Sequence, residues 1–404
     1  MEESPLKPKV RTDLTVNPIE QDGQRILLIE DPLGIIAEPL AVTEVGGLIL
    51  SLLDGERTAE DIEGYFGEVV RGEVPTGFVA EQIQQIASLG LLEDEDYHLK
   101  REEVLGTYKA STSRPPSHAG SAYVEDRDLL TSWMEEILGP SEDTSQSITA
   151  PRILVAPHID FRVNTHTYAS AYKRIRGCEY DRVVLMGTGH SILEGVYSPT
   201  AKNFSTPLGE TPTDRAAIEA LLSTDHGVVG TYDFPHKSEH ALEFQLIFLQ
   251  HLLGSENFEL VPILCGSVYP WLQSHERLGE VEALQSFLES LREIIQAPDR
   301  KTLVVAGVDF SHVGLRFSHP VPAAAMLEET RQHDRQLIDA FNAWDVESFW
   351  GAEVESQGRF NVCGFSTLST LMEAMEPVET ECFSYEVWDD TPTGSAVTFA
   401  AISG

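Results

Sequence analysis

The spacing of apolar residues after about residue 150 predicts alternating strands and helices. Short runs rich in Val, Ile and Leu lie at 152–157, 182–187, 259–264 and 302–307. Apolar runs of this kind, separated by helices, are typical of parallel strands that are buried on both faces of a sheet. The periodicity between the runs predicts helices near 166–175, from Asp214, across 238–253, near 277–296 and at 323–342.

The end of the chain has a different pattern. Residues 381–388 and 395–403 are joined by the turn sequence DDTPTG and predict an antiparallel hairpin. The fold class expected here is therefore α/β, with a mostly parallel sheet flanked by helices and a C-terminal antiparallel hairpin.

The first hundred residues carry shorter elements. We expect a hairpin of 25–30 and 35–40 around the turn sequence DPLG, helices at 43–55, 58–66 and 75–90, and a closing strand at 91–99. Thr43 and Thr58 are suited to N-cap positions, and Asp61 stands where a capping box needs an acceptor. Three short helices with small strands favour a winged-helix-like module.

Two segments rich in Ser, Pro and Gly interrupt these patterns. GTYKASTSRPPSHAG at 106–120 predicts a linker, and GPSEDTSQSITAP at 139–151 predicts a loop. We therefore expect two domains, residues 1–107 and 108–404.

The charge of the chain excludes one class of partner. With 28 basic and 65 acidic residues the net charge is −37, which argues against binding the phosphate backbone of a nucleic acid. No apolar run reaches the ~18 residues of a membrane span, and MEESPLKPKV lacks the apolar core of a signal peptide. The four cysteines are widely spaced, as expected for free thiols in a cytoplasmic protein.

Residues that bind metals or move protons follow three of the predicted strands. LVAPH ends at His158, VVLMGTGH ends at His190, and VVAGVDFSH ends with Asp309 and His312. Ligands of open α/β sheets bind beyond the carboxyl ends of the strands. A single histidine after a strand is commonly structural, but three such strand ends together predict one shared crevice.

Two further segments extend this candidate site. In KSEHALEFQL, Ser238 as N-cap would place His240 and Glu243 on one helical face, with the helix dipole favouring a neutral imidazole. In NVCGFST, Cys363 precedes an expected helix, whose N-terminus would stabilise a thiolate. The alternative for this cysteine is a buried apolar filler. His236 is a further candidate because it is close to His240.

The motifs resemble those of the Memo family, which includes the bacterial and archaeal proteins called AmmeMemoRadiSam system protein B. The resemblance covers about residues 114–403 and implies a fold similar to class III extradiol ring-cleavage dioxygenases, including LigB. The segments that carry it are SHAGSAYV, LVAPHIDF, GTGHS, STPLGETPTD, EHALEFQLIFLQ, VPILCG, GVDFSH and NVCGFSTL.

The resemblance implies a metal site of His158, His190 and Cys363. It places Asp309 and His312 beside the metal and His240 across the same pocket.

This chain also departs from the family pattern. Many relatives have a second histidine where it has Ser191 and an arginine where it has Phe365, and Asp160 adds an acidic group after the first histidine. We therefore expect a different substrate specificity with the same ligand set.

Residues 20–97 resemble the PqqD-like family through LSLLDGERTAEDIEGYF and IASLGLLED. That resemblance implies a module that docks a peptide or protein. The alternative is a winged-helix module for dimerisation or packing.

Three functions follow as hypotheses. The first is a metal-dependent redox enzyme acting on a small molecule or a peptide-borne group, with copper or iron as the metal ion. In it His240 and His312 move protons and Asp309 orients His312. A thiolate ligand makes the site softer and favours Cu(I) or Zn(II). The Fe(II) dioxygenases instead bind their metal with two histidines and one carboxylate.

The second hypothesis is a non-catalytic scaffold in a peptide-modification system. A radical-SAM protein, implied by the name of the relatives, would be the partner that performs the chemistry on a bound peptide. The third is zinc-dependent hydrolysis, with a metal-activated water and His240 or His312 as the base.

Overall fold

A computed structural model describes residues 7–21, 24–70, 75–140, 150–224 and 227–404. The chain divides into two compact units, Met1–Ala110 and Ser111–Gly404. Each unit has its own buried apolar core and is described separately below.

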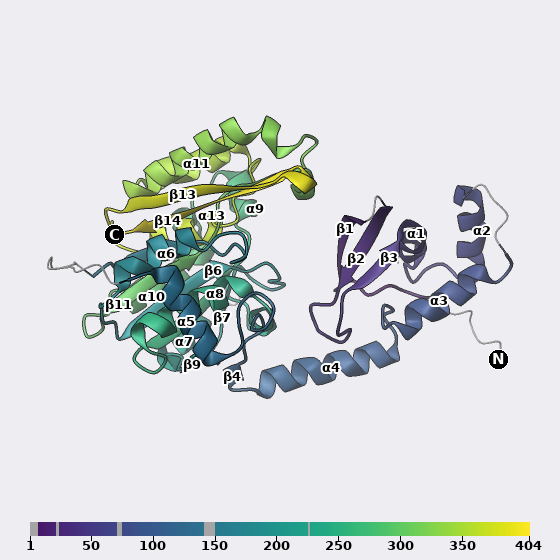
Figure 1. Cartoon of the computed structure of the whole chain (residues 1–404), viewed down its shortest axis with the longest axis horizontal. Coiled ribbons are helices and arrows are strands. Elements are labelled where there is room, and N and C mark those ends of the chain that lie inside the picture. Colours follow the sequence, from purple (N-terminus) through teal and green to yellow (C-terminus); the bar gives the residue numbers. More distant parts are fainter. Residues whose placement is uncertain (1–6, 22–23, 71–74, 141–149, 225–226) are drawn as a thin grey trace. The chain divides into compact units, whose positions relative to one another are not determined.

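In its described residues, the first unit combines a small antiparallel sheet with four helices (Figure 1). Its strands pair in the order β1-β2-β3, and its core includes Ile49, Ile62 and Val79. The elements are β1 (Thr15–Gln21), β2 (Gln24–Glu30), β3 (Leu40–Thr43), α1 (Glu44–Leu52), α2 (Ala59–Val70), α3 (Phe78–Ser88) and α4 (Glu95–Ala110).

The helix caps expected in this unit are confirmed. Thr43 accepts a hydrogen bond from the backbone N–H of Gly46 at the start of α1, at 3.2 Å. Before α2, the Asp61 N–H donates to the Thr58 hydroxyl, and the Asp61 carboxylate accepts from the Thr58 N–H. This reciprocal pair is the capping box that the spacing predicts.

Two expectations for this unit are wrong. β2 pairs antiparallel with β3 across the DPLG turn, as expected, but β3 begins only at Leu40, so residues 35–39 are not a strand; β2 also pairs with β1. Residues 95–110 form α4 where the prediction had a strand to residue 99, because Asp94 caps Tyr97 and the segment is rich in helix-forming Glu, Lys and Leu. Leu92 makes only an isolated bridge to Val10.

The predicted linker at 106–120 is also wrong in most of its length. α4 runs to Ala110, and Ser113–Arg114 forms β4, which pairs with β8. Arg114 is fully buried, so this segment is part of the second unit and not a spacer. Most of the predicted loop at 139–151 lies outside the described residues.

The second unit is built on a large mixed sheet, and the predicted α/β fold is confirmed. Its strand order is β12-β14-β5-β11-β6-β10-β7, with β13 paired to β14. The large sheet is made of β5 (Ile153–Ala156), β6 (Arg182–Thr188), β7 (Tyr197–Pro199), β10 (Glu259–Cys265), β11 (Thr302–Gly307), β12 (His312–Gly314), β13 (Glu381–Asp390) and β14 (Ser395–Ser403). A second, three-stranded sheet joins β4, β8 (Asn203–Thr206) and β9 (Gly209–Thr211).

The four predicted apolar strands β5, β11, β6 and β10 are parallel neighbours. Their side chains alternate between two cores: along β11, Leu303 and Val305 belong to one core and Val304 and Ala306 to the other. Strands buried on both faces need continuous apolar sequence, which explains the uninterrupted runs. The predicted terminal hairpin is confirmed as the antiparallel pair β13–β14.

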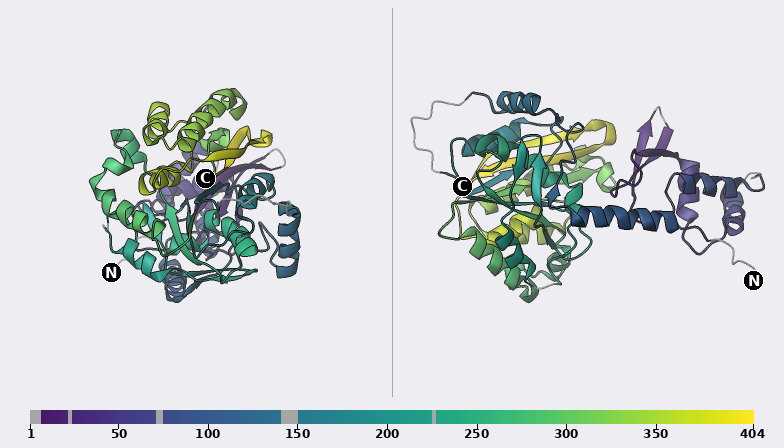
Figure 2. Two further views of the ribbon diagram at one scale, coloured as in Figure 1. Left: turned by 90° about the vertical axis from the view of Figure 1, so that its left-hand side faces the viewer. Right: turned by 90° about the horizontal axis from the view of Figure 1, so that it is seen from below.

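Helices cover both faces of this sheet (Figures 1 and 2). The core that contains Leu303 and Val305 is completed by α5 (Arg127–Leu138), α6 (His166–Tyr172) and α8 (His240–Leu253). The core that contains Val304 and Ala306 is completed by α7 (Arg215–Leu222), α10 (Glu282–Ile295), α11 (Leu327–Asn342), α12 (Val346–Ser356) and α13 (Phe365–Ala374), with α9 (Tyr269–Ser274) beside them. Among the described residues, no helix combines the length and apolarity needed to cross a membrane.

Candidate functional site

The candidate site lies at the carboxyl ends of three adjacent strands. β11 pairs in parallel with β5 on one side and with β6 on the other. His158 follows β5, Asp309 follows β11 and His190 follows β6. The structure therefore brings together the three strand ends that the sequence singled out.

His158 is at the buried centre of this group. Its Nδ1 lies 3.0 Å from the carbonyl oxygen of Gly307, which can only accept, so Nδ1–H donates and Nε2 is the free nitrogen. Nε2 is 3.5 Å from Cys363 Sγ and 3.7 Å from Asp309 Oδ2. Burial, together with the neighbouring His240 and His190, lowers the pKa of His158 well below its ordinary value. This imidazole is neutral at physiological pH.

Cys363 reaches His158 because the backbone turns tightly at the start of α13. The Cys363 N–H donates to Phe310 O and the Gly364 N–H to Asp309 O. A Cβ on Gly364 would lie 2.7 Å from the Asp309 carbonyl oxygen, so only glycine allows this approach. Burial and the nearby Asp309 raise the pKa of the thiol, in contrast to the thiolate expected at a helix N-terminus.

Glu239 links the other two histidines of the site. Its carboxylate accepts from His190 Nδ1 at 3.0 Å and lies 3.2 Å from His240 Nδ1. It also accepts from the backbone N–H groups of His190 and Ala241. Although burial opposes it, the hydrogen bonds and charges of the two histidines hold the pKa of Glu239 well below its ordinary range.

The expected geometry of α8 differs in two respects. Glu239 is the N-cap, not Ser238, and His240 is the first helical residue. Glu243 does not join the site: its carboxylate pairs with Arg114 and accepts from Tyr123 and from the backbone of Ser117. It anchors the segment before α5 to the first turn of α8.

The three imidazoles of the site are mutual neighbours. Their ring centroids are 5.3 Å apart for His158 and His190, 5.1 Å for His158 and His240, and 5.2 Å for His190 and His240. Within the described part of the chain, the group whose ligand atoms all lie within 4.8 Å of one another is His190, Glu239 and His240. Of the three residues expected to bind a metal ion, His158 and Cys363 are in direct contact through Nε2 and Sγ. The ring of His190 adjoins that of His158.

Asp309 and His312 occupy separate positions. The Asp309 carboxylate accepts from the His158 N–H at 3.0 Å, and burial raises its pKa to about 7. His312 Nδ1 donates to the Phe310 carbonyl at 3.1 Å, and burial lowers its pKa to about 4. Asp309 therefore contacts His158, while a backbone oxygen orients His312.

Sequence reasoning missed two residues of the site. Glu239 precedes His240 directly, and an acidic residue at an N-cap is the signal that points to it. His118 was overlooked because it stands in the segment predicted as a linker. Its ring centroid is 5.9 Å from that of His240, and its Nε2 donates to Ser238 O.

The departures from the family pattern have structural counterparts. Phe365 is buried and stacks on Phe349, with centroids 5.3 Å apart, so it is a core residue. Asp160 pairs with Arg162 and is not drawn into the histidine group. His236 is buried and bonds to Ser198 O, which assigns it a structural place.

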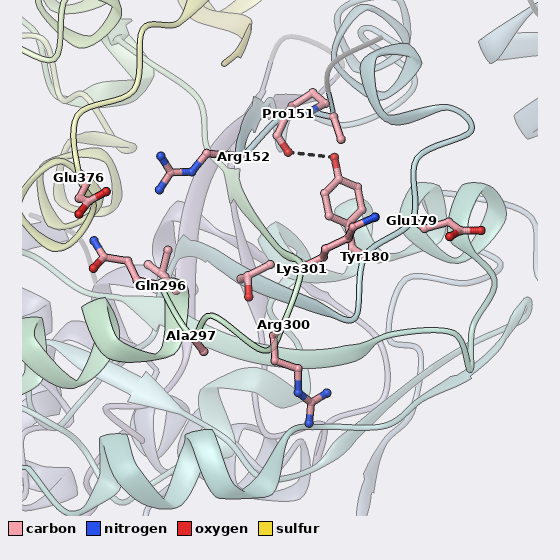
Figure 3. A pocket seen from close by; sticks show the side chains of 12 residues that line it. Pro151, Arg152, Glu179, Tyr180, Gln296, Ala297, Arg300, Lys301 and Glu376 are labelled. Atoms are coloured by element: carbon pink, nitrogen blue, oxygen red, sulfur yellow. Dashed lines mark hydrogen bonds between the residues drawn. The ribbon is translucent and has the colours of Figure 1, made fainter. Parts of the chain in front are cut away.

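A separate hollow of about 490 Å³ lies at the opposite edge of the sheet (Figure 3). Its lining includes Arg152 before β5, Tyr180 before β6 and Lys301 before β11. These positions mark the amino ends of the same strands. The hollow is therefore distinct from the histidine group.

Comparison with known proteins identifies the family. The family described as Memo-like protein matches residues 114–403. The chain belongs to the Memo family. The match includes the three strand ends, Glu239 and Cys363, and it begins at the buried Arg114.

Individual Memo relatives extend this finding. A MEMO1 family protein of Aquifex aeolicus (strain VF5) is 29% identical over 412 residues, covering 98% of this chain and 99% of the relative. The protein memo-1 homolog of Caenorhabditis elegans is 29% identical over 65% of this chain and 71% of its own length. A MEMO1 family protein of Methanopyrus kandleri is 28% identical over 69% and 93%. The A. aeolicus alignment thus spans both units.

Proposed function

We propose that this protein is a metal-dependent redox enzyme whose ion is held by His158, His190 and Cys363. One observation carries the proposal: Nε2 of the buried His158 faces the sulfur of the partly buried Cys363 at 3.5 Å, at the strand ends. A second imidazole, His190, adjoins the first. Nitrogen and sulfur donors suit copper, zinc or iron better than magnesium or calcium.

The residues present fit such an ion in donor type, and the hydrogen bonds at Nδ1 leave Nε2 of both histidines available to it. His158 Nδ1 is bonded to Gly307 O and His190 Nδ1 to Glu239. Metal-binding histidines characteristically donate their second ring N–H to a carboxylate or carbonyl in this way. A bound cation would also favour the thiolate form of Cys363, which burial alone disfavours, because a coordinated thiol is deprotonated.

The other residues of the site supply proton chemistry. A bound copper or iron ion would supply one-electron transfer, with positions left open because the protein offers three ligands. Burial raises the pKa of Asp309 to about 7 in the ion-free site, so its carboxyl can hold a proton there, and a bound cation would favour release of that proton. His240, at the edge of the group, is placed to accept one, whereas His312, whose pKa burial lowers to about 4, is a weak base and is suited to accept a hydrogen bond.

The relation to extradiol dioxygenases is part of this proposal. The mixed sheet and the strand-end histidines are compatible with that fold, and the substrate would be a small molecule or a peptide-borne group. Cys363 in place of a carboxylate would give a softer ion site than the Fe(II) site of those enzymes. The substrate chemistry would differ accordingly.

The first unit has a docking role in the proposal. It has a core of its own, and the PqqD-like resemblance supports binding of a peptide. If the second unit performs no chemistry, the whole chain would act as a scaffold for a radical-SAM partner. That alternative is an outcome of the experiment below.

Metal content tests the proposal. The full chain is purified without a His-tag under anaerobic conditions, and Fe, Cu, Zn and Mn are quantified in wild type, His158→Ala and Cys363→Ser. We expect near-stoichiometric copper or iron that both substitutions abolish. His98→Ala is the control, because His98 is an exposed side chain of the first unit.

The other outcomes contradict the redox assignment. Stoichiometric zinc lost in both variants would replace it by hydrolytic chemistry. No metal after reconstitution with each ion would leave the scaffold role.

A further inference from the structure

We propose that Glu239 is a positioning residue that holds His190 and His240 as a pair. It binds Nδ1–H of both rings, so that Nε2 of each is the nitrogen left for an ion or a substrate. The family resemblance assigns no role to this carboxylate. The metal-affinity part of the inference rests on the proposed function, while the ring geometry does not.

The hydrogen-bonding capacity of Glu239 supports positioning over metal ligation. An ionised carboxylate offers about four lone-pair sites. Four donors already surround it: the Nδ1–H groups of His190 and His240, and the backbone N–H groups of His190 and Ala241. The carboxylate is saturated by protein donors and leaves no oxygen for an ion.

The same contacts decide the tautomers of the two rings. A carboxylate only accepts, so each Nδ1 that it contacts must carry a proton. In a neutral imidazole the other nitrogen, Nε2, then carries the lone pair. His158 follows the same rule through Gly307 O, so all three imidazoles of the group are held at Nδ1.

Glu239 also joins two elements of the fold. His190 belongs to the turn after β6, and His240 opens α8. Because the carboxylate is 5% exposed and is the N-cap of α8, it ties the turn to the helix without solvent competition. α8 approaches closely enough that a Cβ on Gly307 would lie 2.4 Å from Ala241 O.

The competing assignment is a two-His-one-carboxylate metal site. The Nδ1–oxygen separations of 3.0–3.2 Å match the ~3 Å between neighbouring ligands of an octahedral ion. In that arrangement the ion would replace the protons on Nδ1. The two assignments differ in which ring nitrogen is protonated and in whether Glu239 is indispensable for binding.

Nitrogen NMR of the metal-free full chain tests the ring geometry. Long-range ¹H–¹⁵N correlation at alkaline pH, where imidazoles are neutral, distinguishes Nδ1–H from Nε2–H. Signals are assigned with His190→Ala and His240→Ala. We expect both rings as Nδ1–H in wild type. In Glu239→Gln one amide oxygen with two lone pairs replaces the four acceptor sites that serve both rings and two backbone N–H groups, and the amide NH₂ only donates, so we expect at least one ring to become Nε2–H or to interconvert.

A matched control separates this effect from general loss of a buried carboxylate. Glu353 bonds to His333 at 2.8 Å in a buried pair that does not belong to the site. Glu353→Gln should leave the tautomers of His190 and His240 unchanged. Glu239→Asp, which retains the charge and a good N-cap, replaces the glutamine variant if that variant does not fold.

Co²⁺ titration, followed by its visible absorption, gives the second measurement. Loss of a carboxylate that orients a ligand weakens metal affinity by about 10- to 100-fold, and the ligand set and spectrum stay the same. Abolished binding with Nε2–H rings in wild type would overturn positioning in favour of ligation. Unchanged tautomers and an affinity within about threefold would overturn it altogether, while metal loss in Cys363→Ser would leave the proposed function standing.

Discussion

The two edges of the central sheet are made by the same strands and carry opposite environments. Beyond the carboxyl ends, His158, Asp309 and Glu239 are buried and their pKa values are displaced. Beyond the amino ends, Arg152 and Lys301 are exposed around an open hollow (Figure 3). Ionisable side chains therefore occur at both edges, but Arg152 and Lys301 stay in water, whereas His158, Asp309 and Glu239 are removed from it.

The difference teaches that burial, more than residue type, makes the carboxyl edge chemically unusual. Desolvation disfavours charge unless a partner compensates for it. Asp309 has no cationic partner strong enough and its pKa rises to about 7, whereas Glu239 has two imidazoles and its pKa falls. At the amino edge, Arg300 pairs with Glu259 at 2.7 Å in a half-exposed position, where such a pair contributes little.

Of the variants that test this comparison, we expect Arg114→Ala to cause the largest loss in the free energy of unfolding. The Arg114 guanidinium is fully buried, pairs with Glu243 and donates to the carbonyl oxygens of His236 and Glu239. Arg114→Ala leaves the Glu243 charge unpaired, and such losses cost about 3–5 kcal/mol in the free energy of unfolding.

Urea unfolding followed by tryptophan fluorescence measures this loss. All five tryptophans lie in the second unit, so the signal reports on that unit. A loss below about 1 kcal/mol would contradict a desolvated ion pair.

A smaller effect is expected from His236 as the pH falls. Burial lowers the pKa of His236 to about 4 from an ordinary value of 6.5, so the folded state favours the neutral ring. Its stabilisation is complete above pH 6.5 and is lost as the pH falls toward 4, by up to about 3 kcal/mol.

His236→Gln isolates this contribution, because glutamine can still donate to Ser198 O without titrating. Unfolding free energies of both proteins are compared between neutral pH and about pH 4.5. The wild type should lose more stability than the variant. Equal losses would mean that the ring is accessible to protons in the folded state.

We expect the smallest change in the free energy of unfolding from a substitution at the amino ends of the strands. Arg152 is exposed, so Arg152→Ala should change the unfolding free energy by no more than about 0.5 kcal/mol and leave metal content unaltered. The same fluorescence and metal assays apply. A loss above about 1 kcal/mol would break the comparison, because this exposed arginine would then stabilise the fold as much as a buried one.

The sequence could predict elements whose pattern is local. The apolar runs at 182–187 and 302–307 became β6 and β11, Asp214 caps α7, and the terminal hairpin pairs as expected. The prediction of a strand at 91–99 was wrong, because residues from Glu95 onward form α4. Helix-forming residues and the Asp94 cap outweighed a short apolar stretch.

The candidate site was predictable in membership more than in geometry. Strand ends brought His158, His190 and Asp309 together because parallel neighbours share a carboxyl edge. The role of Asp309 was not predictable, since its contact with His158 depends on how the backbone turns after β5. Glu239 was missed because an N-cap residue is identified only once the helix start is fixed.

The sequence by itself determined the α/β class, the order of strands and helices along the chain, and the residues that end the strands, because apolar periodicity and capping act over a few neighbouring positions. Only the tertiary structure decided which carboxylate holds which imidazole, that Arg114 and His118 hydrogen-bond to the start of α8, and which ionisable side chains are removed from water. These outcomes depend on contacts between residues about 50 to 200 positions apart, where burial and hydrogen-bond saturation, not local propensity, set the free energy.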